Sequence, residues 1–230
     1  MRRLARIGLG LAALLALGGC GMVPAGVAST PSQLLYMRMT MRGAVDENAY
    51  YLFVINTAAN SSEGPEVIAA NTSYLGNGLA TGYYTHYVMY HQGIFELYRD
   101  EPAQQGVTPP APTALGQPWA YDDSNAASGT LTCTLDTSVL KPSTTSAALQ
   151  QIELNFITDN EIVLPGAAPS VPRQSDGLGP DGTTFLVVQL ENGIVINNNG
   201  IAVAGGLFGG VPLSPAYDIT DFNVTVESGS

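Results

Sequence analysis

The sequence predicts an all-β protein, an antiparallel β-sandwich of about nine to ten strands with long loops. Short runs of residues alternate between apolar and polar positions, which is typical of half-buried strands. No long segment follows the helical period, and the 26 Gly and 15 Pro supply turn signals between the runs. Many short strands separated by turns favour a sandwich over a helical or mixed fold.

The first twenty residues read as a targeting leader. Arg2, Arg3 and Arg6 precede an uncharged apolar run over residues 7–17. A helix needs roughly 20 apolar residues to cross a hydrocarbon core, so this run is too short for a span but suits a signal peptide. An ordinary secretory signal and an uncleaved anchor are the alternatives.

The leader ends in Leu17-Gly18-Gly19-Cys20, which resembles the lipobox of bacterial lipoproteins. The resemblance implies cleavage after Gly19 and lipid on the thiol and amine of Cys20. Two or three acyl chains hold a protein firmly at a membrane. Gly21 follows the cysteine, where enteric bacteria use Asp for inner-membrane retention. We therefore expect an exported protein anchored to the bacterial cell envelope, in the outer membrane if the cell is Gram-negative.

The expected cleavage divides the chain into a signal peptide (1–19), a lipidated N-terminus with a flexible tether (20–32) and a single β-sandwich domain (33–228). The leader holds three of the eight basic residues and none of the 19 acidic ones, so its removal changes the net charge from −11 to 5 − 19 = −14. This acidic chain lacks the basic footprint that nucleic-acid binding requires. We expect the membrane as a partner through lipid, and no nucleic acid.

The early strands show the clearest patterns. In residues 33–42 one face carries Leu35, Met37, Met39 and Met41, which we interpret as core packing; the other carries Tyr36, Arg38, Thr40 and Arg42. Residues 49–57 are apolar on both faces and predict a central strand. Residues 81–99 predict a β-hairpin that turns at Gln92-Gly93, where glycine permits a positive φ.

The later chain is more interrupted. Residues 101–118 hold five prolines and predict a loop or covering segment rather than a strand. In 129–136 we expect Leu131, Cys133 and Leu135 to face inward, and Thr130, Thr132, Thr134 and Asp136 to face outward. Cys133 is then a small buried hydrophobe, not a nucleophile. One helical turn could form at 146–151, and further strands are expected at 152–158, 183–191, 193–197, 201–205 and 221–228.

No catalytic motif of the common kinds is present, so we expect a protein that is not an enzyme. Scattered carboxylates could still serve a glycoside hydrolase; the candidates are Glu96, Asp122, Asp123 and Asp136. His86 and His91 should point to opposite faces of a strand, which disfavours a shared metal. No cofactor is expected except a possible structural calcium. Its candidate ligands lie in oxygen-rich turns at 46–48 and 122–125 and in 176–181, with Asp122, Asp123, Asp176 and Asp181 as the main candidates.

Aromatic residues gather around the 81–99 hairpin and just after the proline-rich segment. Aromatic faces can stack on sugar rings, and the candidates for ligand binding are Tyr84, Tyr87, Tyr90, Trp119 and Tyr121. Strand alternation would place Tyr84 and Tyr90 on one face and Tyr87 on the other. The alternative is that these tyrosines are ordinary residues of a half-buried strand.

The order of elements over about 45–160 resembles family-nine carbohydrate-binding and related DOMON-like sandwiches. The segments that carry it are 50–56, 85–99, 130–140 and 149–160. Residues 180–230 have no counterpart, and the strand at 50–56 lacks the expected acidic ending. The resemblance implies a sandwich that binds glycan or another surface component and transfers no binding residue. The alternatives are an envelope lipoprotein that makes structural protein–protein contacts, and an envelope glycoside hydrolase.

Overall fold

The computed structural model describes residues 31–58, 64–68, 78–100, 111–141, 149–162, 171–202, 207–208 and 211–229. The chain divides into two units, 1–30 and 31–230, and the described residues all belong to the second. The leader and Cys20 therefore lie outside them. No described helix is long and apolar enough to cross a membrane.

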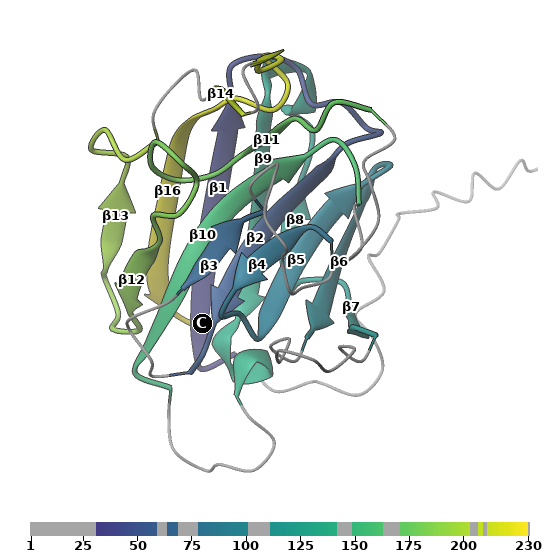
Figure 1. Ribbon diagram of the computed structural model, residues 1–230. Coiled ribbons are helices and arrows are strands. Elements are labelled where there is room, and N and C mark those ends of the chain that lie inside the picture. Colours follow the sequence, from purple (N-terminus) through teal and green to yellow (C-terminus); the bar gives the residue numbers. More distant parts are fainter. Residues whose placement is uncertain are drawn as a thin grey trace, which may run out of the picture. The chain divides into compact units, whose positions relative to one another are not determined.

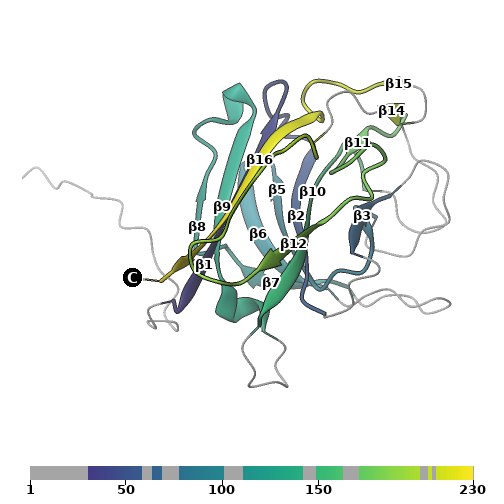
Figure 2. The same ribbon diagram turned by 90° about the vertical axis from the view of Figure 1, so that its left-hand side faces the viewer.

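The structure confirms an all-β sandwich of antiparallel sheets (Figures 1 and 2). Sheet A has the order β13 (Val195–Asn197), β16 (Ile219–Ser228), β1 (Gln33–Met41), β9 (Thr130–Asp136) and β8 (Ala120–Asp122). Sheet B has the order β11 (Ser175–Asp176), β10 (Gln151–Asp159), β2 (Tyr50–Asn56), β5 (His86–His91), β6 (Ile94–Arg99) and β7 (Thr113–Gly116). In addition, β12 (Leu186–Gln189) pairs with β10. The described part of the chain has no α-helix, only the 3₁₀ turns η1 (Ala126–Ser128) and η2 (Thr137–Leu140).

The main core lies between the two sheets. The predicted methionine stripe of β1 is confirmed, because Met37 and Met39 are fully buried and Tyr36 on the opposite face is not. Phe156 of β10 contacts its neighbour Phe53 of β2 within sheet B at a centroid distance of 5.6 Å. It also stacks on Phe222 of β16 at 5.3 Å, and this contact links sheet B to sheet A.

The outer face of sheet B carries a second apolar cluster. A short hairpin of β3 (Pro65–Val67) and β4 (Ala80–Gly82) lies over β2 and β10 on this side (Figures 1 and 2). The cluster consists of Leu52, Val54, Val67, Leu79, Ala80, Tyr84, Tyr87 and Ile157. The central position predicted for 49–57 is therefore confirmed. Among the described residues, no element packs over the outer face of sheet A.

The predicted β-hairpin is confirmed as β5 and β6, with φ of 52° at Gln92 and 75° at Gly93. Positive φ at both central residues matches the twist of the flanking strands. The expected face of Tyr84 is wrong, because β5 begins only at His86, after a turn at Gly82 with φ of 77°. Tyr84 therefore joins Tyr87 in the outer cluster.

The chain has more strands than predicted, sixteen in the described residues, because many are too short to show alternation. The loop predicted at 101–118 is wrong in its second half: β7 forms there between Pro112 and Pro118, at a sheet edge where proline is tolerated. Residues 101–110 lie outside the described residues. Of two other predicted elements, residues 149–150 are not helical and 201–202 are not in a strand; 146–148 and 203–205 lie outside the described residues. A separate two-stranded sheet joins β14 (Leu207–Phe208) to β15 (Val211–Pro212).

Candidate functional site

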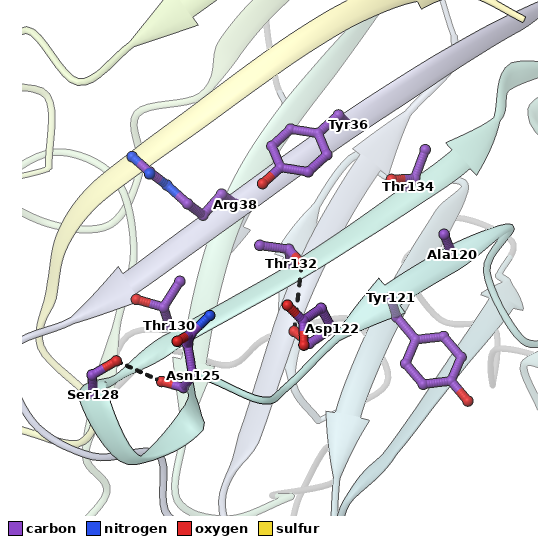
Figure 3. Close-up of a pocket in the computed structure, with 10 residues that line it drawn as sticks. All are labelled: Tyr36, Arg38, Ala120, Tyr121, Asp122, Asn125, Ser128, Thr130, Thr132 and Thr134. Carbon is purple, nitrogen blue, oxygen red and sulfur yellow. Dashed lines mark hydrogen bonds between the residues drawn. The ribbon is translucent and has the colours of Figure 1, made fainter.

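A groove lies on the outer face of sheet A (Figure 3). Its larger part encloses about 580 Å³ and is lined by Tyr36, Arg38, Ala120, Tyr121, Asp122, Asn125, Ser128, Thr130, Thr132 and Thr134. An adjoining hollow of about 400 Å³ is lined by Leu34, Tyr36, Trp119, Ala120, Thr134, Thr225 and Glu227. The two share Tyr36, Ala120 and Thr134, so we treat them as one feature, the sheet A groove.

Strand alternation supplies the floor of this groove. In β9, Leu131, Cys133 and Leu135 are buried, so the threonines between them face outward as the sequence predicted. The antiparallel register of β1 and β9 sets Tyr36 opposite Thr134, and Arg38 opposite Thr132. On the other side of β1, Tyr36 lies opposite Thr225 of β16. The floor is therefore a hydroxyl-rich surface with one tyrosine at its centre.

Some polar side chains of the groove are already bound to the protein. The Thr130 and Thr40 hydroxyls lie 3.3 Å apart, and Thr132 donates to the Asp122 carbonyl at 3.4 Å. By contrast, the side chains of Tyr36, Thr134 and Asn125 have no hydrogen-bond partner among the described residues. These three groups can donate to and accept from a ligand without breaking a bond in the protein.

The charges of the groove are mostly negative. Arg38 pairs with Asp221, with 2.9 Å between Nη2 and Oδ2, and both side chains are partly exposed. Hydrogen bonds from the Ser124 side chain and backbone lower the pKa of Asp122, which is therefore ionised at neutral pH. Glu227 is exposed in the adjoining hollow. The single cation is already paired, and the two other charged groups are carboxylates.

The two predicted aromatic residues near the groove have different roles. Trp119 is 47% exposed and lines the hollow beside Tyr36. Tyr121 is 44% exposed, but it lies opposite Cys133, so its ring is on the inner side of the sheet edge. There it stacks on Phe95 with a centroid distance of 5.1 Å, and Figure 3 shows it pointing away from Tyr36. Trp119 thus lines the groove, while the Tyr121 ring packs against Phe95 at the edge of the core.

The three hairpin tyrosines of the predicted ligand set lie inside the protein. Tyr84, Tyr87 and Tyr90 are 2%, 4% and 1% exposed, so they cannot form a solvent-facing row, and the packing alternative describes them better. Sequence reasoning did not select Tyr36 or Asn125 as site residues. The signal for Tyr36 was its outward place opposite the methionine stripe. Asn125 was considered only as part of the oxygen-rich turn at 122–125, as a candidate for calcium and not for a glycan.

The calcium candidates do not assemble in the described residues. No group of three or more His, Cys, Asp or Glu side chains there is placed to hold a metal. Asp122 is exposed and Asp123 half-buried. Asp176 is buried and accepts a hydrogen bond from the Ile219 amide at 2.8 Å, whereas Asp181 is exposed.

The carboxylates considered for hydrolysis are also separated. Glu96 lies on β6 in sheet B and accepts a hydrogen bond from Tyr98. Asp136 was expected to face outward, but it is buried; its carboxylate accepts a hydrogen bond from the Ser138 amide at 2.9 Å and caps η2. Only Asp122 of the four candidates lines the groove. No arrangement for acid–base catalysis is therefore seen among them.

The two histidines also lie apart. His86 is buried at the start of β5, where burial and the nearby Arg99 lower its pKa to about 4, and its Nδ1 lies 2.9 Å from the Thr85 hydroxyl. His91 stacks on Tyr50 at a centroid distance of 4.2 Å. Both side chains have structural contacts that explain their presence.

Comparison of the chain with protein-family models, with curated protein sequences and with solved structures finds no match. The resemblances to lipoproteins and to carbohydrate-binding sandwiches therefore stay predictions. Function must be argued from the groove itself.

Proposed function

We propose that this chain is a lipid-anchored protein of the bacterial cell envelope, and that its non-catalytic β-sandwich binds glycan or another surface component in the sheet A groove. The observation that carries the proposal is the groove itself. It combines an exposed indole, a central tyrosine and unbonded polar side chains on a face that no described element covers.

The chemistry of the groove suits a sugar better than an apolar ligand. Trp119 and Tyr36 present aromatic rings on which the C–H face of a sugar could stack. Tyr36, Thr134 and Asn125 offer both donors and acceptors to hydroxyl groups. Because these groups stand on paired strands or a tight turn, little conformational entropy would be lost on binding.

Binding can be followed directly, because Trp119 is the only tryptophan in the chain. A glycan that occupies the groove should change its fluorescence, and Tyr36→Ala should weaken the response. Tyr83→Ala is the matched control, since Tyr83 is 38% exposed and lies between β4 and β5, away from sheet A. A glycan array with Trp119→Ala gives an independent readout. An equal loss of binding in Tyr83→Ala would contradict a site in the groove.

The anchor is supported by the leader sequence alone and is tested separately. Cys20→Ala should move the protein from the detergent-requiring membrane fraction to the soluble one. Cys133→Ala is the control, because Cys133 is buried in the domain and should not affect membrane attachment. Persistent membrane attachment of Cys20→Ala would exclude lipidation of this cysteine.

An assembly role is the second candidate, favoured by the exposed sheet edges. Every residue of β7 and β8 is exposed, and this segment also exposes Leu115, Trp119 and Tyr121. An open edge can pair with a strand of another chain. Pull-down of one stoichiometric envelope protein, lost on Leu115→Asp but not on Tyr36→Ala, would favour this role over glycan binding.

A further inference from the structure

We infer that the ligand of the sheet A groove is an uncharged polysaccharide that lies extended along β1 and β9. This inference rests on the proposed function and specifies the class of glycan and how it lies relative to the strands. Three observations support it: the length of the groove, its charges and the separation of its aromatic and polar ends.

The groove is long and runs with the strands. One end is formed by Asn125, Ser128 and Thr130, and the other by Leu34, Trp119 and Glu227. Along β9 the paired positions extend from Thr130, opposite Thr40, to Asp136, opposite Leu34. The six residue steps from Thr130 to Asp136 span about 20 Å. This length exceeds a single sugar and fits several linked rings.

The two ends offer different contacts. Trp119 supplies a ring face at one end, and the Asn125 amide lies near the other, with Asp122 beside it as an acceptor. Tyr36 and Thr134 stand in the middle and belong to both hollows. A chain of rings along the groove could therefore meet stacking, hydroxyl and amide contacts in turn, which a compact ligand could not.

The charge excludes anionic glycans. Arg38 is the only basic residue in the groove and is paired with Asp221, while Asp122 and Glu227 lie towards opposite ends. With residues 1–19 removed, the chain has five basic residues against 19 acidic ones. The uronate or phosphate groups of an anionic glycan would find no free cation to pair with, because the one basic side chain is already paired. The carboxylates are exposed and screened by salt, so they add little attraction for a cationic sugar.

The probes are size series of glucose, mannose and N-acetylglucosamine oligomers, with galacturonic acid oligomers as anionic and glucosamine oligomers as cationic counterparts. Titrations follow Trp119 fluorescence on the whole lipid-free domain. We expect a neutral series to bind, with affinity rising from the dimer until the groove is filled. Asn125→Ala and Thr134→Val should each weaken the longest oligomer about five- to tenfold, the typical effect of one lost hydrogen bond.

Two variants test whether the polysaccharide lies along the strands. Because Asn125 lies far from Trp119 along the strands, Asn125→Ala should weaken the longest oligomer more than a dimer that stacks on Trp119. Thr113→Val, at an exposed position of β7 in sheet B, is the matched control for Thr134→Val and should bind normally.

Three results would overturn the inference. The first is tighter binding of the anionic or cationic series than of any neutral series. The second is equal affinity for the dimer and the longest oligomer, and the third is the absence of binding by every neutral series. If a charged series binds and Tyr36→Ala abolishes that binding, the proposed glycan site survives and only the class is wrong. If none of the three charge classes binds, glycan binding itself is refuted.

Discussion

Replacing Asp176 by Asn should stabilise the domain at neutral pH and have much less effect at acidic pH. Asp176 is 2% exposed in β11, and burial, assisted by the nearby Asp218, raises the pKa of its carboxyl from 3.8 to about 7. Hydrogen bonds from the Ile219 and Gly177 amides oppose this rise without cancelling it. Asn keeps an oxygen that can accept from Ile219 and removes the ionisation.

The sign follows from proton linkage. Between pH 3.8 and about 7 the unfolded chain has released this proton while the folded protein keeps it, so the free energy of unfolding falls as the pH rises. The loss of stability is complete above the folded-state pKa and amounts to about 4 kcal/mol, of which about 3 kcal/mol develops between pH 4.5 and pH 8. The stability difference between Asp176→Asn and wild type should therefore grow by about 3 kcal/mol between these two pH values.

Urea unfolding followed by circular dichroism at several pH values measures this difference. Subtracting the two proteins removes the pH dependence that other acidic residues contribute. Asp181→Asn is the matched control, because Asp181 is exposed in the same segment and its replacement should give a nearly constant difference. A difference for Asp176→Asn that stays flat from pH 4.5 to pH 8 would refute the reasoning.

Three further predictions concern packing and backbone geometry. Phe156→Ala removes the ring that joins Phe53 and Phe222, and should cost about 3–5 kcal/mol in urea unfolding. Gly129→Ala should destabilise the domain far more than Gly93→Ala in the same assay. The φ angle is positive at both residues, but a Cβ at residue 129 would lie 2.3 Å from the Gly43 carbonyl oxygen, whereas a Cβ at residue 93 would meet nothing within 4 Å. Equal losses of stability would show that the contact with Gly43 is unimportant. Cys133 should resist thiol reagents until the domain unfolds, because burial raises the pKa of its thiol; rapid labelling of the folded domain would contradict its place in the core.

Much of the fold could be predicted because alternation records which side of a strand is buried. The stripe from Leu35 to Met41 and the threonines of β9 followed the expected pattern. Prediction failed where strands were too short to alternate, as in β7 and β8, or where a side chain was taken up by a local bond, as in Asp136. The first failure arises from pairing with other strands and the second from a bond to a residue two positions along the chain, and alternation encodes neither.

The site was less accessible to sequence reasoning. The clustering of Tyr84, Tyr87 and Tyr90 suggested a binding face, yet the second apolar cluster and the main core bury all three. Trp119 was identified, but its partner in the groove is Tyr36, more than eighty residues earlier in the chain. Only strand pairing brings β1 beside β9, so no local pattern could show this partnership.

By itself the sequence determined the all-β class, the burial of Cys133, the acidic character of the chain and the outward threonines, because each depends on composition or on a period of two. The tertiary structure decided which sheet face was covered. The β3–β4 hairpin lies over sheet B and helps to bury Tyr84 and Tyr87, while the outer face of sheet A has no such cover among the described residues. Which side of a sandwich remains open depends on how distant segments pack, and that choice placed the candidate site on β1, β8 and β9.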